Sequence, residues 1–79
     1  MQRVEKILSQ ILGIDEDSIT DDTSPDNVES WDSFNGLLIA SELERVFDVK
    51  FTMQEISETK NVGDIKRNLK QHGIKLINN

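Results

Sequence analysis

The sequence predicts an all-α protein folded as a small four-helix bundle. Two segments, residues 4–11 and 62–69, repeat apolar residues at the spacing of one helix face, and residues 33–47 are apolar around nearly the whole helix circumference. No segment of the chain has a strong strand pattern. Because 79 residues is the size of one domain, we expect residues 1–79 to form a single bundle of three main helices and a short one.

The first helix is expected at residues 2–12. Its apolar residues fall at positions i, i+3, i+4 and i+7 of one face: Val4, Ile7, Leu8 and Ile11. Gly13 follows the last turn and suits a left-handed C-cap, after which Ile14 can fold back onto the helix. The helix is therefore predicted to end at residue 12.

Residues 13–31 form the next segment, which is rich in Asp, Ser and Thr and has neither helical nor alternating periodicity. This composition predicts a long loop. Loops longer than about 12 to 15 residues are uncommon in compact domains unless they carry function or a short helical turn. We expect Ile19 and Val28 to hold this loop against the core.

The second helix is expected at residues 33–47, with Asp32 as its N-cap. Apolar residues cover nearly all of its faces, so the helix is either fully buried or exposes some of them to a partner. In so small a domain we expect exposure, with Leu38 as the leading candidate. We expect the interior of the bundle to be lined by residues such as Ile7, Leu37, Leu43, Val62 and Ile65.

Two further helices are expected at residues 53–57 and 62–72. The first has room for only one or two turns. Asn61 can cap the second, and Asp64 stands three residues on, in the place of a capping-box acid. The apolar stripe of this last helix is Val62, Ile65 and Leu69.

The C-terminal end of the chain closes the last helix. Gly73 marks its end, and His72 in the last turn suits the negative end of the helix dipole. The tail, residues 73–79, is expected either to pack through Ile74 and Leu76 or to fray.

The charge pattern limits the possible partners. The net charge is −6, and residues 1–31 hold eight acids against two bases, whereas residues 59–79 hold one acid against five bases. An acidic protein lacks the basic face that binding to a phosphate backbone requires, so we expect no nucleic-acid partner. The acidic part either provides solubility or steers basic partner proteins towards the chain.

The composition also limits the chemistry and the location. The chain has no cysteine, which excludes disulfides, thiolate metal sites and cysteine nucleophiles. Its first residues are amphipathic and charged rather than signal-like, and no apolar run approaches membrane-spanning length. We therefore expect a cytoplasmic monomer that does not insert into membranes.

The acidic loop raises the question of a calcium site. An EF-hand loop that started at Asp15 would have Asp17 at its third position. The pattern then fails, because Ile19 is at the fifth position, Thr20 replaces the required glycine, and Asp26 replaces the bidentate glutamate. The sequence favours at most weak, salt-sensitive cation binding, and we assign no metal ligands.

Ser33 stands in the most informative chemical setting of the chain. Serine catalysis requires an adjacent base and an oxyanion site, and the single histidine, His72, belongs to the last helix, so we expect no catalysis. A serine in the first turn of a helix lies beside unpaired N–H groups, which favours a covalently attached phosphate. Local spacing leaves two interpretations: Ser33 is an attachment point, or it caps the helix together with Asp32.

The triplet Asp32-Ser33-Phe34 resembles the Asp-Ser-Leu triplet that begins the second helix of acyl carrier proteins and peptidyl carrier domains. The resemblance spans nearly the whole chain, from the amphipathic first helix and the long acidic loop to LERVFDVKF at the end of the second helix and NVGDIKRNL at the start of the fourth. It implies that a phosphopantetheinyl transferase moves 4′-phosphopantetheine from coenzyme A onto Ser33. Acyl groups would then travel as thioesters on its terminal thiol between loading and transfer enzymes.

The chain also departs from the family pattern. Housekeeping fatty-acid carriers usually have Gly-Ala before the Asp-Ser pair, whereas this chain has Ser30-Trp31. Their second helix carries a row of acids, and the corresponding positions here include a single acid: Asn35, Leu38, Glu44 and Arg45. The resemblance therefore favours a stand-alone carrier for a specialised pathway.

Under this resemblance, the residues that would contact the transferase or a cognate enzyme are Asp32, Phe34, Asn35, Leu38, Glu44 and Arg45. Phe34 and Leu38 would form a patch more apolar than is usual. The cargo stays open between fatty acyl, polyketide and aminoacyl groups, as does the sheltering of an acyl chain in the interior. The alternatives from other classes are an unmodified helical adaptor that docks through the second helix and a calcium-responsive module.

Overall fold

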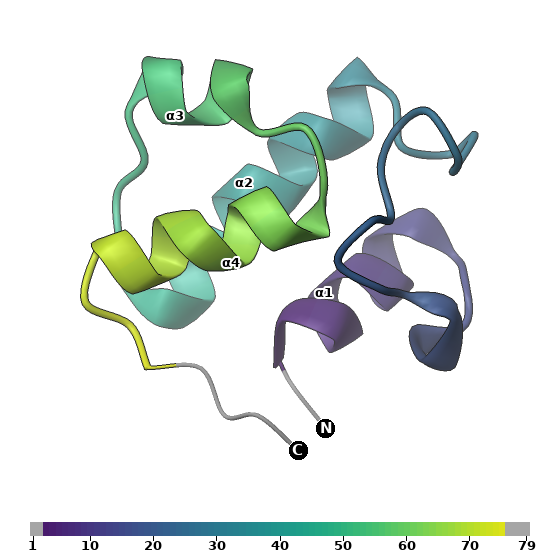
Figure 1. The fold of residues 1–79 in the computed structure, drawn as a ribbon, viewed down its shortest axis with the longest axis horizontal. Coiled ribbons are helices and arrows are strands. Elements are labelled where there is room, and N and C mark those ends of the chain that lie inside the picture. The colour runs from purple at the N-terminus through teal and green to yellow at the C-terminus, as the bar shows by residue number, and fades with distance from the viewer. Residues whose placement is uncertain (1–2, 76–79) are drawn as a thin grey trace.

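The computed structural model describes residues 3–75, which form four α-helices, one short 3₁₀ helix and no strand (Figure 1). The elements in chain order are α1 (Arg3–Leu12), η1 (Glu16–Ser18), α2 (Ser33–Phe47), α3 (Met53–Glu58) and α4 (Val62–Gln71). The all-α, four-helix prediction is confirmed. The observed ends of the four α-helices differ from the expected ones by no more than one residue.

The helices surround one core, and the long loop runs along its side. In Figure 1, α2 passes obliquely behind α4, the short α3 lies above α4, and α1 lies next to the loop that precedes α2. The start of α2 lies next to the loop that leads into it.

Left-handed residues end α1 and α2. Gly13 has a φ of 69°, and its N–H donates to the carbonyl oxygen of Ser9 at 2.9 Å, as the sequence predicts for a glycine C-cap. At the end of α2 the same role falls to Asp48, with a φ of 54° and an N–H that donates to the carbonyl oxygen of Glu44. Aspartate tolerates this conformation better than most residues, so α2 ends without a glycine.

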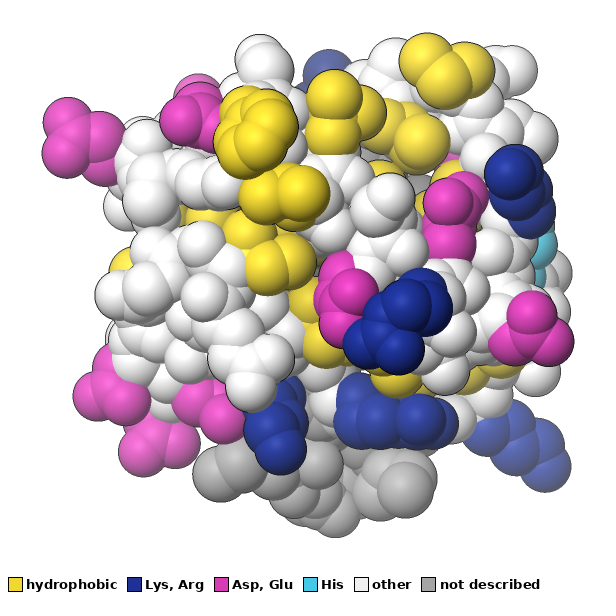
Figure 2. Space-filling model, turned by 180° about the vertical axis from the view of Figure 1, so that it is seen from behind, with side chains coloured by type: hydrophobic (Ala, Val, Ile, Leu, Met, Phe, Trp, Pro, Cys, Tyr) yellow, Lys and Arg dark blue, Asp and Glu magenta, His cyan; other side chains and the backbone are white. Residues whose placement is uncertain are grey.

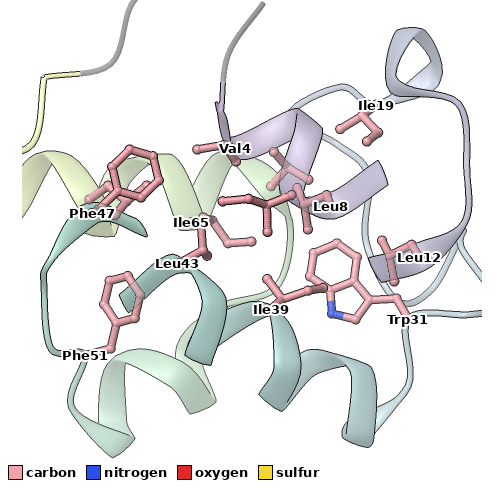
Figure 3. Close-up of a cluster of buried hydrophobic side chains, with 13 residues drawn as sticks. Val4, Leu8, Leu12, Ile19, Trp31, Ile39, Leu43, Phe47, Phe51 and Ile65 are labelled. Carbon is pink, nitrogen blue, oxygen red and sulfur yellow. The ribbon is translucent and has the colours of Figure 1, made fainter. Parts of the chain in front are cut away.

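Among residues 3–75, thirteen buried hydrophobic side chains form the core, and Figure 3 draws them as sticks. Ile19 is among them, and Val28 packs against the core while partly exposed, so both hold the loop as predicted. Trp31, whose burial the sequence left open, is 7% exposed.

The interior position expected for Leu37 is wrong, because this side chain is 59% exposed. Since α2 turns Ile39 into the core, Leu37 lies about 200° away around the helix and faces outward.

Hydrogen bonds tie the long loop to the start of α4. The backbone N–H groups of Val62 and Gly63 donate to the carbonyl oxygens of Thr23 at 3.0 Å and Asp21 at 2.9 Å. Thr23 is itself buried, and its Oγ1 accepts from the N–H of Thr20 at 2.9 Å. The loop therefore has a defined conformation in which its polar residues satisfy one another and the first turn of α4.

The N-terminal caps of α3 and α4 differ, because only that of α3 is a full capping box. Thr52 and Glu55 form a full capping box at α3, a T-x-x-E signal that the sequence analysis missed. Asn61 caps α4 by accepting from the N–H of Asp64 at 2.8 Å, as predicted. Asp64 does not complete a capping box with Asn61, because its Oδ2 accepts from the N–H of Lys60 at 2.9 Å instead.

The chain turns back after α4. Gly73 has a φ of 86°, and the N–H of Ile74 donates to the carbonyl oxygen of Leu69 at 3.0 Å. Ile74 packs partly buried against the core, as expected for one of the two tail residues. The other, Leu76, lies outside the described residues.

Candidate functional site

The junction between the loop and α2 is held by a chain of polar contacts. Asp32 is the N-cap, as predicted: its Oδ1 accepts from the N–H of Asn35 at 2.9 Å. Asn35 Nδ2 donates to the carbonyl oxygen of Ser30 at 2.7 Å, and Ser30 Oγ donates to the carbonyl oxygen of Leu12 at 2.8 Å. These bonds connect the start of α2 to the end of α1, so the backbone around Ser33 is held independently of its side chain.

Ser33 is the first residue of α2, and its side chain is exposed. Asp32 provides the cap, and the Ser33 hydroxyl makes no hydrogen bond to any of residues 3–75. The N–H groups of Ser33 and Phe34 also find no acceptor in that range, as is usual for the first turn of a helix. The hydroxyl is therefore accessible and lies beside free donors at the positive end of the helix dipole.

His72 is engaged elsewhere in the fold. Its Nε2 lies 3.0 Å from both carboxylate oxygens of Glu55, and its ring packs edge-on against Phe51 with 5.5 Å between ring centroids. The bond from His72 adds to the N–H of Thr52, the main cause, in holding the pKa of Glu55 below its ordinary value. These contacts join the end of α4 to α3 and do not bring the ring to Ser33 as a base.

A cleft of about 520 Å³ opens beside Ser33 and is lined by α2, α3, α4 and the loops that flank them. Its apolar lining residues are Pro25, Trp31, Leu37, Ile39, Ala40, Leu43, Phe51, Ile56 and Ile65. Asp32, Ser33 and Gly36 line it at the start of α2, and Thr59 and Asn68 add a polar patch in which Asn68 Nδ2 donates to Thr59 Oγ1 at 3.0 Å. The cleft is thus mainly apolar and has the exposed Ser33 hydroxyl among its lining groups.

Large hydrophobic side chains are exposed along α2 and α3. Phe34 is 69% exposed, Leu38 is 42% exposed and Met53 is 77% exposed, together with the outward-facing Leu37. Figure 2 shows hydrophobic side chains gathered in the upper part of the face opposite to that of Figure 1, with basic side chains along its lower edge. Exposed apolar groups that lie together on one face are typical of surfaces that meet a partner.

The charged residues of α2 are occupied within the protein. Arg45 pairs with Glu42, with Arg45 Nε at 3.1 Å from Glu42 Oε1. The hydrogen bond to Arg45 and its charge hold the pKa of Glu42 below its ordinary value, and the same contacts raise the pKa of Arg45. Glu44 Oε2 accepts from the N–H of Phe51 at 2.8 Å, so this acid connects α2 to the segment before α3.

The six predicted recognition residues therefore differ in how accessible they are to a partner. Phe34, Leu38 and Arg45 are exposed, Asp32 is exposed while it caps α2, and Asn35 and Glu44 are half-buried in structural hydrogen bonds. Gly36 also lines the cleft and was not among the predicted site residues, and Trp31, whose position the sequence left open, lines it too. The sequence did offer one signal for Gly36, since a glycine inside an otherwise apolar helix often has a packing or functional reason.

The described residues form neither a metal site nor a membrane span. Among residues 3–75, no three His, Asp or Glu side chains are grouped so that they could hold a metal ion. In the acidic loop, the carbonyl oxygen of Asp15 instead accepts from the N–H and the hydroxyl of Ser18, at 3.0 and 2.7 Å. None of the helices in the described part of the chain is long and apolar enough to span a bilayer.

Comparison with known proteins supports the carrier interpretation. The model of the family described as "Phosphopantetheine attachment site" matches residues 2–69, which include the loop, the Asp-Ser pair and most of α4. A search of curated proteins found no significant match to the chain. Domains of this family are the attachment site of a covalently bound 4′-phosphopantetheine group, and they interact with phosphopantetheinyl transferases and acyl-handling enzymes. Since the match covers most of its length, the chain belongs to the phosphopantetheine-attachment family of acyl carrier proteins.

Proposed function

We propose that Ser33 bears the phosphopantetheine group and that the protein delivers acyl groups, held as thioesters, to partner enzymes. The observation that carries this proposal is the position of Ser33, whose exposed hydroxyl stands at the first turn of α2 and lines the apolar cleft. When attached, the group supplies the terminal thiol that the chain itself lacks, since it has no cysteine.

The residues around Ser33 fit a phosphodiester. The free N–H groups of Ser33 and Phe34 are available to phosphate oxygens, and the helix dipole favours a negative charge at this end. Asp32 stays engaged with the N–H of Asn35, so the cap persists when Ser33 is modified. Attachment therefore requires no rearrangement of the backbone at the start of α2.

The cleft offers a place for the cargo. Its lining is mainly apolar, and each methylene group that leaves water gains about 0.8 kcal/mol. An acyl chain that reaches Ile39 and Leu43 would also be shielded from solvent by Phe51 and Ile56. Fatty acyl and polyketide chains fit this lining better than a polar aminoacyl group, which is the alternative cargo.

The proposed partner surface is the apolar row Phe34, Leu37 and Leu38. Because Glu44 and Glu42 are bound within the protein, α2 presents few free acids to a basic partner. This favours a specialised pathway over general fatty-acid synthesis. A ketosynthase of general fatty-acid synthesis should therefore use the acyl-loaded protein poorly, and equal use beside a housekeeping carrier would contradict the specialised role.

Intact mass tests the attachment directly. Incubation with coenzyme A and a broad-specificity phosphopantetheinyl transferase should add one phosphopantetheine to the parent protein and none to Ser33→Ala. Ser41→Ala is the matched control, since Ser41 is an exposed serine of the same helix and should leave loading unchanged. Loading of Ser33→Ala, or no loading of a folded parent protein, would contradict the proposal.

The same exposed row on α2 also suits an unmodified adaptor that docks through this helix. An adaptor would keep its partner and its cellular function in Ser33→Ala, whereas a carrier would lose function with its fold intact. The monomeric state and the cytoplasmic location expected from the sequence remain predictions.

A further inference from the structure

Trp31 carries a polar group that the fold leaves without a partner. Its side chain is 7% exposed, and among residues 3–75 its indole Nε1 donates no hydrogen bond. The hydrogen bonds of this junction are made by Ser30, Asp32 and Asn35 instead. Buried tryptophan N–H groups usually find an acceptor. Nε1 is not among the fully buried atoms of the described residues that lack a partner, so this N–H keeps some accessible surface. Trp31 lines the same cleft as Ser33, so its N–H is available to a group that enters there.

The indole ring is oriented so that this N–H faces α2. Figure 3 shows the six-membered ring turned toward Leu8 in the core and the nitrogen-bearing edge turned away from it. A Cβ atom placed on Gly36 would lie 3.6 Å from Nε1 and 3.9 Å from Cδ1 of Trp31. Gly36, about one helical turn after Ser33, is therefore the α2 residue that lies next to the indole N–H.

The glycine at this position has no backbone explanation. Among the described residues, the glycines with positive φ are Gly13 and Gly73, so Gly36 has a conformation open to any residue. Crowding does not require it either, since the distances to Trp31 are those of ordinary contact. Glycine inside a helix is less favourable than alanine. What the missing side chain does is leave the indole N–H uncovered toward the cleft.

We propose that Trp31 and Gly36 form a hydrogen-bonding notch, in which the indole N–H of Trp31 donates to a carbonyl oxygen of the group attached to Ser33. The notch presupposes the attachment proposed above. The attached group offers this chemistry in two places, the amide carbonyls of the arm and the thioester carbonyl of the cargo. In either case the notch would hold the group along the cleft and give the indole N–H a carbonyl acceptor in place of water.

The single tryptophan provides the test, because a ¹⁵N–¹H spectrum of the protein contains one indole resonance. The spectrum is compared between the unmodified protein, the phosphopantetheine form and the form loaded from octanoyl-coenzyme A. Formation of the hydrogen bond should move the indole proton downfield and slow its exchange with water by about fivefold, the effect of one ordinary net hydrogen bond. A change in the phosphopantetheine form identifies an amide of the arm, and a change confined to the octanoyl form identifies the thioester.

Gly36→Ala is the informative variant. The added methyl group fits at 3.6 Å from Nε1 without displacing the ring, and alanine favours the helix, so the protein should fold. The indole resonance is compared only for material that intact mass shows to be fully loaded. Because the methyl group covers the N–H, loading should no longer change the indole resonance. Ser41→Ala, at an exposed position of α2, should respond to loading as the parent protein does.

The outcomes separate the notch from the attachment. If mass shows complete loading at Ser33 while the indole resonance stays unchanged in both loaded forms, the notch is refuted and the attachment stands. A parent-like response of Gly36→Ala would also refute the role of Gly36. Failure to load at all would instead refute the attachment on which the notch depends.

Discussion

Replacement of Lys66 by methionine tests how the long loop is held in the fold. Lys66 Nζ lies 2.6 Å from Glu5 Oε2 and 3.0 Å from Asp21 Oδ1. One ammonium group of α4 thus connects α1 to the loop. Burial of the ammonium by itself would lower the pKa of Lys66, but the hydrogen bonds and charges of Glu5 and Asp21 outweigh it and raise this pKa above its ordinary value.

The expected cost follows from the burial of the three groups. The side chains of Lys66 and Glu5 are 20% and 16% exposed, whereas that of Asp21 is 67% exposed. Glu5 Oε1 is buried and has no hydrogen-bond partner among the described residues, so loss of the ammonium leaves this carboxylate poorly compensated. Exposed pairs contribute about 0.2 to 1 kcal/mol and breaking a buried pair costs about 3 to 5 kcal/mol, which places Lys66→Met near 2 kcal/mol.

Urea and thermal unfolding at pH 7 measure this cost. A loss of about 2 kcal/mol should lower Tm by roughly 8 to 16 °C in a domain of this size. Methionine keeps most of the apolar stem, so the loss reports mainly the charge. Lys70→Met is the matched control on the exposed side of α4 and should change stability by less than about 0.5 kcal/mol.

A double-mutant cycle and the pH dependence complete the test. Lys66→Met and Glu5→Gln together should cost at least about 1 kcal/mol less than the sum of the single changes. Since the pKa of folded Lys66 lies above its unfolded value of 10.5, its contribution is fully present below pH 10.5 and is lost as pH rises through the folded pKa. A variant within about 0.5 kcal/mol of the parent, or strictly additive costs, would refute the view that Lys66 holds the loop.

Four further substitutions test the helix cap, the position of α2 and the contact between α3 and α4. Asp32→Ala should lower the free energy of unfolding by about 1 kcal/mol in urea, because the N–H of Asn35 loses its acceptor, and an unchanged midpoint would contradict the cap. Leu43→Ala should cost about 2 to 5 kcal/mol and Leu37→Ala less than about 1 kcal/mol by the same assay; similar costs would contradict the outward position of Leu37. Because the pKa of folded Glu55 lies below its unfolded value of 4.5, its contribution is present above pH 4.5 and is lost as pH falls through the folded pKa. Glu55→Gln should therefore lose less stability than the parent on acidification below pH 4.5, and an equal loss would contradict the role of Glu55.

Features that depend on neighbours in sequence were predictable. The stripes of α1 and α4, the glycine after α1, and the caps at Asp32 and Asn61 all involve residues within about one helical turn. The position of Ser33 at the start of α2 follows from the same local signals. The sequence by itself therefore determined the four helices and the setting of the serine.

Features that depend on packing between elements were not predictable. In α2, apolar residues surround the helix, so the pattern alone cannot say which side is buried. Contact with the other helices buries Ile39 and leaves Leu37 outside. In the same way, only the fold joins Glu44 to the N–H of Phe51 and Lys66 to Glu5.

The cleft and the burial of Trp31 also depend on packing between elements. Ser33, Trp31 and Gly36 are close in sequence, but the other walls of the cleft come from the segments around Phe51 and Ile65. The burial of Trp31 against α1 and α2 is likewise a matter of how the helices meet. Local interactions set the helices and place the serine, whereas the space beside it exists only because distant segments pack together, which no short stretch of sequence encodes.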